Sequence, residues 1–105
     1  MKTLSSGSME KLSQSGKITV IDFYATWCGP CKKTMKSLEE LESEMTDIEF
    51  WSCNVETEED IASKFGIRNL PTVIVMKDGK RVGSITGGLP KDVLMENLKS
   101  VIREF

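Results

Sequence analysis

The stretch ITVIDFYATWCGPC, which runs from Ile18 to Cys31, decides the fold of this chain. Residues 18–25 form an almost continuous run of β-branched and aromatic residues, which is typical of a central strand covered on both faces. From Pro30 to about Met45, apolar residues recur three and four positions apart, and most charged side chains fall on the opposite face. That spacing predicts an amphipathic helix, so a central strand is expected to lead directly into a helix.

The remaining elements are marked by the same kinds of apolar spacing and by turn residues between them. They are a strand over 48–55, a helix from the N-cap Thr57 to Gly66, a strand over 72–76, a turn at 77–80, a strand over 81–86, and a helix from Pro90 whose apolar stripe reaches Phe105. The piece ahead of residue 18 gives only a weak signal for structure.

The order of these elements predicts an α/β fold. Strands and helices alternate in the first half, so the strands there are expected to pair in parallel through crossover helices. The hairpin at 72–86 adds an antiparallel edge. The chain has 105 residues, without a repeat or a linker, and we therefore expect a single domain over residues 1–105.

Composition narrows the possible functions. The net charge of −2 argues against nucleic acid as the main partner, because binding to phosphates needs clustered Lys and Arg. With no His and three Cys, one chain cannot complete a four-ligand Cys/His zinc site. No apolar run is long enough to span a membrane, and the residues after Lys2 lack the apolar core of a secretion signal. We expect a cytoplasmic protein, in a compartment that keeps thiols reduced.

Two cysteines, Cys28 and Cys31, lie three residues apart where the strand meets the helix. Residues at this spacing on a helix have Cβ atoms about 5–6 Å apart, and a disulfide needs about 3.8 Å, so a small tightening of the first turn closes the bond. The helix dipole and the unpaired N–H groups of that turn lower the pKa of the first thiol. Pro30 suits this turn, since its missing N–H would be unpaired anyway. A redox pair is favoured, and a metal shared between two chains stays the alternative.

Three further residues have two interpretations each. Asp22 lies within the apolar run, where it is either a buried proton acceptor with a raised pKa or a strand-end residue that caps a loop or faces water. Pro71 is expected to follow a trans bond and to start a strand, because only about 5–6% of X–Pro bonds are cis. Cys53 is favoured as a small buried hydrophobe, with a regulatory thiol as the alternative.

The motif Trp27-Cys-Gly-Pro-Cys31 resembles the active-site motif of the thioredoxin family, and further matches in the family's order cover nearly the whole chain. They lie at 22–25, Lys32, 66–68, 71–72, 77–79 and Gly87. The resemblance implies the thioredoxin fold, a central mixed β-sheet with helices on both faces. The chain departs from many family members at Tyr24, where Trp is common. It departs again at Ser52, where many bacterial members have a Lys close to the buried acid.

The resemblance also implies a role for each residue of the site. Cys28 would be the exposed nucleophile, Cys31 the buried resolving thiol, and Asp22 the buried acid that accepts the Cys31 proton through water. The active-site loop and substrate-binding residues would be Trp27 beside the cysteines, Gly29 and Pro30 between them, Leu70 pairing its backbone with an extended substrate, Pro71 after a cis bond, and Gly87 keeping the surface open.

The function that follows from the resemblance is that of a general protein-disulfide reductase. Such a monomeric protein would reduce disulfide-containing proteins without a cofactor or metal of its own. A flavin-containing thioredoxin reductase that uses NADPH would re-reduce it. A disulfide isomerase or oxidant, a binding subunit whose redox chemistry is idle, and a metal-bridged dimer are the alternatives.

Overall fold

The computed structural model describes residues 1–13 and 16–103 and contains a five-stranded sheet in the order β1-β3-β2-β4-β5. The elements in chain order are β1 (Lys2–Thr3), the 3-10 helix η1 (Ser6–Ser13), β2 (Ile18–Tyr24), α1 (Gly29–Glu44), β3 (Ile48–Asn54), α2 (Glu59–Lys64), β4 (Thr72–Lys77), β5 (Lys80–Thr86) and α3 (Lys91–Arg103). The predicted strand-to-helix order and the mixed sheet are confirmed.

Strand β2 is the centre of the sheet. It pairs in parallel with β3 and antiparallel with β4, so that Asp22 lies between Ser52 and Val73 in the register. Five consecutive residues of β2, from Thr19 to Phe23, are buried. The apolar run at 18–25 therefore corresponds to a strand covered on both faces, as the sequence predicts.

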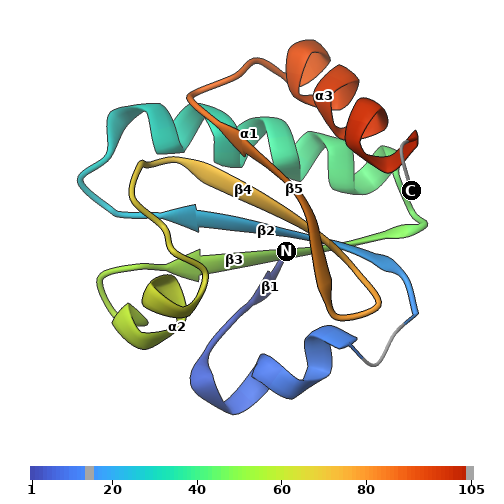
Figure 1. Cartoon of the computed structure of the whole chain (residues 1–105). Coiled ribbons are helices and arrows are strands. Elements are labelled where there is room, and N and C mark those ends of the chain that lie inside the picture. The colour runs from blue at the N-terminus through green and yellow to red at the C-terminus, as the bar shows by residue number, and fades with distance from the viewer. Residues whose placement is uncertain (14–15, 104–105) are drawn as a thin grey trace.

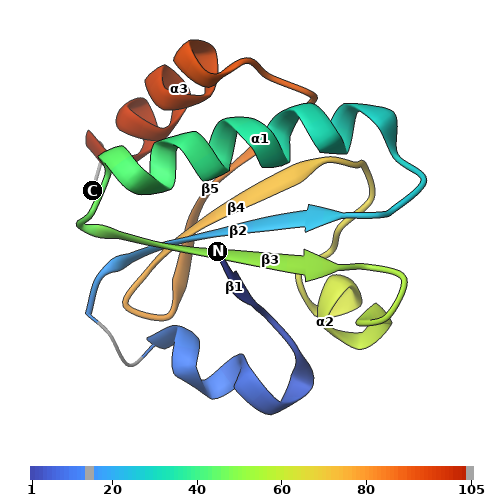
Figure 2. The same ribbon diagram turned by 180° about the vertical axis from the view of Figure 1, so that it is seen from behind.

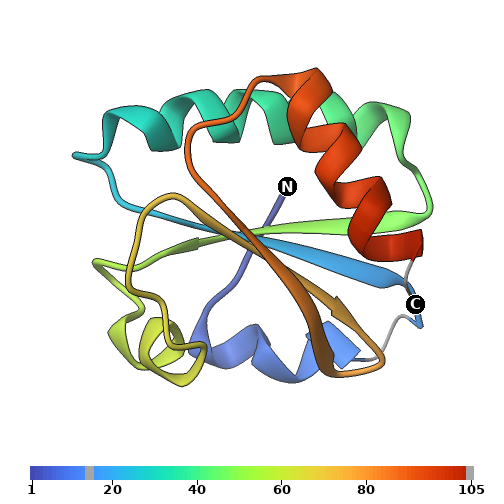
Figure 3. The same ribbon diagram turned by 45° about the horizontal axis from the view of Figure 1, so that its top comes forward.

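Helices cover both faces of this sheet (Figures 1 and 2). Helices α1 and α3 lie side by side on one face, as Figure 3 also shows, and α2 and η1 lie on the other. Because side chains alternate along a strand, Val20 packs with Leu38 of α1, whereas Ile21 packs with Ile61 of α2. The same alternation directs Asp22 toward the α1 face of the sheet.

The turn at 77–80 forms as predicted, with Asp78 and Gly79 at φ 52° and 77° between the strands of the hairpin. Gly66, at φ 65°, follows the end of α2 as its predicted C′ residue. Pro90 directly precedes the first residue of α3. Phe105, predicted on the apolar stripe of that helix, lies outside the described residues.

The predicted N-cap of the second helix is wrong. Glu58 occupies that position, and its side chain makes no capping bond. Thr57 instead belongs to the turn after β3, where its backbone N–H and its hydroxyl both donate to the carbonyl oxygen of Asn54. A local Thr-Glu-Glu-Asp pattern fits a cap and a turn equally well, and the path of the chain out of β3 decides between them.

The N-terminal piece is more ordered than its sequence signal indicates. Strand β1 pairs in parallel with β3 at the edge of the sheet. Leu4 and Leu12 are buried in the core on the α2 face. A strand of two residues has too few positions to show a period, so these long-range contacts leave no local pattern.

We predict that Gly83→Ala destabilises the protein. A Cβ at this position in β5 would lie 2.6 Å from Cγ1 of Val101 in α3, which is closer than two carbon atoms can approach. The free energy of unfolding should fall by about 1–3 kcal/mol, measured by urea denaturation. Gly7→Ala is the control, since a Cβ there meets nothing within 4 Å. Adding Val101→Ala should restore part of the loss, and a fully stable Gly83→Ala variant would refute this packing.

Candidate active site

Cys28 lies at the junction between the central strand and the first helix. Strand β2 ends at Tyr24, a short loop follows, and Cys28 is the N-cap of α1, with φ −86° and ψ 109°. Pro30 lies in the first turn of the helix, where its lack of an N–H costs no hydrogen bond. The sequence placed the cysteine pair at this junction, and the structure confirms that position.

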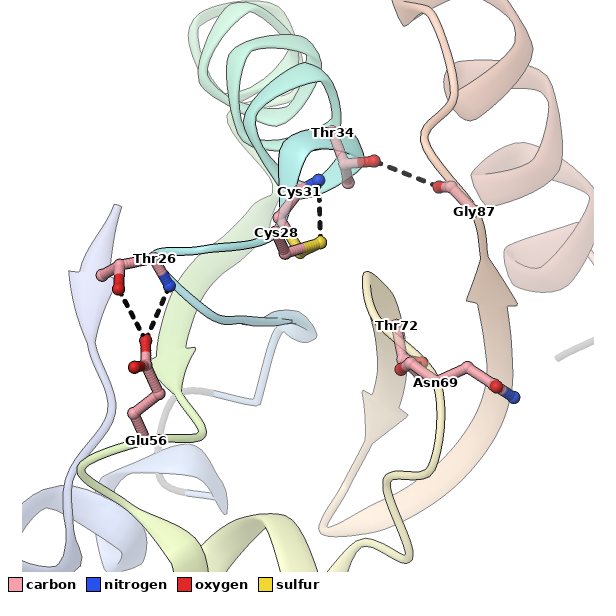
Figure 4. The surroundings of a disulfide bond; sticks show 8 residues. All are labelled: Thr26, Cys28, Cys31, Thr34, Glu56, Asn69, Thr72 and Gly87. Atoms are coloured by element: carbon pink, nitrogen blue, oxygen red, sulfur yellow. Dashed lines mark hydrogen bonds between the residues drawn. A yellow bond between two sulfur atoms is a disulfide. The ribbon is translucent and has the colours of Figure 1, made fainter.

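Cys28 and Cys31 form a disulfide, with Cα atoms 5.3 Å apart. The backbone N–H of Cys31 donates to Sγ of Cys28 at 3.3 Å (Figure 4). This N–H of the first helical turn therefore points at the sulfur that would carry the negative charge of a Cys28 thiolate. Such a donor, with the positive end of the helix dipole, favours the thiolate and lowers the pKa of a thiol at that position.

The two cysteines differ little in exposure. Cys28 is 5% exposed and Cys31 is 2% exposed, so the expectation of an exposed Cys28 is wrong for the disulfide-bonded form. Both cysteines pack in one small cluster with Ala25, and Tyr24 and Leu70 cover it from the side. What distinguishes the two sulfurs is the hydrogen bond from the helix N-terminus to Cys28, rather than access to solvent.

Asp22 is fully buried. Its side chain is 0% exposed, and neither carboxylate oxygen has a hydrogen-bond partner among the residues that the structure describes. Burial raises the pKa of this carboxyl to about 7. The interpretation of Asp22 as a residue that caps a loop or faces water is excluded. The carboxyl can hold or release a proton near neutral pH, and its position on the α1 face of β2 directs it toward the helix that carries the cysteines.

Ser52 is the register partner of Asp22 on β3 and brings no charge to it. Burial alone accounts for the raised pKa of the carboxyl. With Ser rather than a charged residue at this position, desolvation is what sets the pKa of Asp22 in this chain.

The Leu70–Pro71 peptide bond is cis, the isomer that the family resemblance implies and the residues alone do not. Two hydrogen bonds join this turn to the rest of the site. The N–H of Gly87 donates to the Pro71 carbonyl at 3.1 Å. The hydroxyl of Thr34 in α1 donates to the Gly87 carbonyl at 3.1 Å, as Figure 4 shows. Thr34, which sequence reasoning missed, could have been recognised as a polar residue on the buried side of an amphipathic helix.

Two adjacent residues beside this turn, Gly87 and Gly88, must be glycine for different reasons. A Cβ on Gly87 would meet nothing within 4 Å, but the residue has φ 99°, so its backbone conformation is what requires glycine. A Cβ on Gly88 would lie 3.0 Å from both Cβ and the carbonyl oxygen of Pro30. The close approach to the active-site loop is therefore made by Gly88, which the sequence did not single out.

Trp27 is 73% exposed, the largest exposed apolar side chain beside the disulfide. It borders a groove whose wall also contains part of the loop before Pro71. The lining residues are Trp27, Val55, Ala62, Ile67, Arg68, Asn69 and Leu70. Trp27 and Leu70, predicted separately, thus line one surface next to the cysteines.

The third cysteine, Cys53, lies on the opposite face of the sheet from α1. It is free, 0% exposed, and packed in the same core cluster as Phe23 and Ile61. Burial and then the negative charge of Glu58 raise the pKa of its thiol to about 11. Cys53 therefore packs as a small buried hydrophobe that stays protonated at neutral pH, as the favoured interpretation predicts.

Across residues 1–13 and 16–103, no group of three or more His, Cys, Asp or Glu side chains is arranged to hold a metal ion. Over the same residues, none of the helices combines the length and the apolar character needed to cross a bilayer.

Comparison with known proteins matches this chain to one family. The family model described as Thioredoxin matches residues 3–100. A thioredoxin of Mycoplasmoides gallisepticum is 40% identical over 91 residues, which is 87% of this chain and 91% of that protein. A thioredoxin of Bacillus subtilis is 40% identical over 80 residues, 75% of this chain and 77% of that protein.

Solved structures agree with the sequence matches. The thioredoxin of Fasciola hepatica has a TM-score of 0.87 at 33% identity, covering 95% of this chain and 98% of that one. Thioredoxin f2 of Chlamydomonas reinhardtii has a TM-score of 0.86 at 27% identity, covering 95% and 94%. The predicted sheet with helices on both faces is thus the fold that these proteins share.

We predict that Asp22→Asn changes how stability depends on pH. The pKa of this carboxyl is about 7 when folded and near 3.8 when unfolded, so the folded state holds the proton more tightly. The contribution of this carboxyl to the stability of the wild-type protein must then fall as pH rises from about 4 through 7, and stay low above that. Relative to the unchanged protein, Asp22→Asn should gain about 2–3 kcal/mol between pH 5 and pH 9.

Urea denaturation of the oxidised protein at pH 5 and pH 9 measures this gain. The oxidised form is used because Cys28 and Cys31 do not titrate when they form a disulfide. Glu59→Gln, at an exposed position, is the control and should show the same difference from the unchanged protein at both pH values. A constant difference for Asp22→Asn as well would mean that the carboxyl does not titrate with a raised pKa.

Proposed function

We propose a division of labour among the residues of this active site, on the premise that the chain belongs to the thioredoxin family. The chain is a protein-disulfide oxidoreductase that reduces protein disulfides by exchange at Cys28 and Cys31. The observation that carries the assignment is the disulfide across the first turn of α1, with the Cys31 N–H directed at the Cys28 sulfur.

Cys28 makes the first attack. Its thiolate attacks one sulfur of the substrate disulfide and forms a mixed disulfide, and the other substrate sulfur leaves as a thiolate and takes up a proton. The hydrogen bond from the helix N-terminus supports this role, because it favours charge on Cys28 over Cys31.

Cys31 makes the second attack. It loses its proton toward Asp22, whose raised pKa suits a proton acceptor near neutral pH, and its thiolate displaces the substrate from Cys28. The substrate leaves with two thiols, and the protein is left with the Cys28–Cys31 disulfide. Two electrons thus pass from the dithiol to the substrate.

An extended segment of the substrate binds across the turn at Pro71. The backbone of Leu70 would pair with this segment as an added strand does, and Trp27 and the groove beside it would contact neighbouring substrate side chains. Gly87 supports this arrangement through its hydrogen bond to the Pro71 carbonyl, which fixes the shape of the turn. Gly29 and Pro30 keep the two cysteines at the spacing that exchange needs.

The family implies disulfide-containing substrates and a reductase that returns the protein to its dithiol form. We propose more specifically that this reductase is a flavoprotein using NADPH, and that the protein acts as a monomer, as a single domain, in the cytoplasm. No cofactor takes part in the exchange, because the dithiol itself carries the two electrons.

We predict that Cys31→Ser traps the substrate. A serine cannot displace the substrate from Cys28, so incubation with insulin should yield a stable mixed disulfide, detected by mass spectrometry under non-reducing conditions. Cys53→Ser is the matched control and should release reduced insulin chains as the unchanged protein does. Cys28→Ser should trap nothing. Mixed disulfide through Cys31 but none through Cys28 would reverse the order of attack.

We also predict that Asp22→Asn slows the second attack. Without a proton acceptor, fewer Cys31 thiols ionise at pH 7, and release of substrate in a single turnover should slow by about tenfold or more. The defect should shrink as pH rises, since the thiol then ionises unaided. Quenched-flow measurement of the mixed disulfide gives this rate, and an unchanged rate at pH 7 would remove Asp22 from the mechanism.

A further inference from the structure

The middle of the loop from β2 into the active-site helix, at Thr26 and Trp27, has little buried surface to hold it. Thr26 is exposed and Trp27 is 73% exposed, although Ala25 is buried. Within the loop, the N–H of Cys28 donates to the Ala25 carbonyl at 3.3 Å, which is long for a hydrogen bond. Segments with few buried contacts open easily unless another part of the chain fixes them.

Glu56, in the turn after β3, makes such a contact with Thr26. One carboxylate oxygen, Oε1, accepts the Thr26 N–H at 2.7 Å and the Thr26 hydroxyl at 2.8 Å (Figure 4). Hydrogen bonds to an ionised acceptor are roughly twice as strong as neutral ones. The bond from the backbone N–H, and then that from the hydroxyl, hold the pKa of the Glu56 carboxyl below its usual value, so it is ionised at neutral pH.

The turn that carries Glu56 is itself well fixed. The N–H of Glu56 donates to Oδ1 of Asn54 at 2.9 Å, and the N–H of Glu58 donates to the Asn54 carbonyl at 2.9 Å. The N–H of Val55 donates to the Tyr24 carbonyl at 2.9 Å, which continues the pairing of β2 with β3 beyond the strands. The carboxylate is thus presented to the loop from a base that is tied to the central strand.

We propose that Glu56 is a positioning residue for thiol–disulfide exchange: it fixes Thr26, and through Thr26 the loop that sets Cys28 and Trp27 against an incoming disulfide. This inference rests on the proposed function, in which Cys28 makes the first attack. Only Trp27 separates Thr26 from Cys28, so a displaced Thr26 moves the sulfur relative to the helix N–H that stabilises it. Exchange needs the attacking and departing sulfurs in line, and small displacements lower its rate.

Two substitutions at position 56, with a control at position 59, separate position from charge. Glu56→Gln keeps an Oε1 that can accept both donors but removes the charge. Glu56→Ala removes the acceptor and the charge together. Glu59→Ala is the matched control, since it removes an equal charge from the same acidic pocket without contact to Thr26. A comparison of Ala with Gln at position 56 therefore reports the hydrogen bonds alone.

The rate of insulin reduction at pH 7, with dithiothreitol as electron donor, measures the effect. Neutral 2-hydroxyethyl disulfide serves as a second probe, because the charge at position 56 does not steer it. We expect Glu56→Ala to react about fivefold more slowly with both probes, because a loop that is no longer fixed holds the Cys28 sulfur in line with the disulfide less of the time. Glu56→Gln and Glu59→Ala should stay within about twofold of the unchanged protein.

The titration of the Cys28 thiol, followed by thiolate absorbance at 240 nm, is a readout that a purely structural role would not move. Variants with Ala and with Gln at position 56 have the same net charge. A higher pKa of the Cys28 thiol in the Ala variant than in the Gln variant would therefore show that the sulfur has moved away from the helix N–H. Equal pKa values of this thiol in the two variants would overturn the inference.

Thr26→Val and Thr26→Ser provide a test that does not depend on the folding of Glu56→Ala. Both keep the backbone N–H, and only Ser keeps the hydroxyl that Glu56 accepts. Thr26→Val should slow insulin reduction and Thr26→Ser should not. In a double-mutant cycle, adding Thr26→Val to Glu56→Ala should cause no further loss, because both act on one contact.

Failure of the proposed function and failure of the role of Glu56 give different experimental results. If the wild-type protein does not reduce insulin, the proposed function is overturned, and this inference with it. If the wild-type protein is active and Glu56→Ala is as fast as Glu59→Ala, only the inference is overturned. Glu56→Gln as slow as Glu56→Ala would also overturn it, because charge rather than position would then be responsible.

Discussion

The alternation of side chains along β2 is the constraint on which the rest of the site depends. Neighbouring residues of a strand face opposite sides of a sheet, so Val20 and Asp22 face α1 while Ile21 and Phe23 face α2. The strand then ends close to the first turn of α1. The buried carboxyl and the dithiol are brought to one face by the register of a single strand, and a slip of one residue would exchange the two faces.

Burial of the Asp22 carboxyl lowers the stability of the fold, and no partner among the residues that the structure describes offsets this cost. Asp22 has neither a charged partner nor a hydrogen-bond partner among the described residues, and its pKa is raised by burial alone. An apolar residue in the same place would suit the core better. A proton acceptor with a pKa near neutrality, however, needs this kind of environment. The burial that weakens the fold is therefore also what brings the pKa of this carboxyl near neutrality.

Local pattern in the sequence was sufficient for the central strand, the active-site helix and the hairpin, because each combines a clear period with clear turn residues. It was insufficient wherever the deciding contact comes from far along the chain. Thr57 has the sequence of a cap but serves a turn, and Gly88 matters only because Pro30 lies against it. The bonds from Thr26 to Glu56 span 30 residues and leave no trace in either local sequence. The isomer at Pro71 came from family resemblance, since the residues alone favour trans.

The bridge from Thr34 through Gly87 to Pro71 has a consequence for the newly made chain. Thr34 and Gly87 are 53 residues apart, so during synthesis the cysteine pair emerges well before the segments that enclose it. Until β4 and β5 join the sheet, the two thiols are attached only to the early strand and helix, without the Pro71 and Gly87 segments that are bonded to this helix in the folded chain. The chain therefore carries its reactive pair before the surroundings of that pair exist, and those surroundings are completed only with its last third.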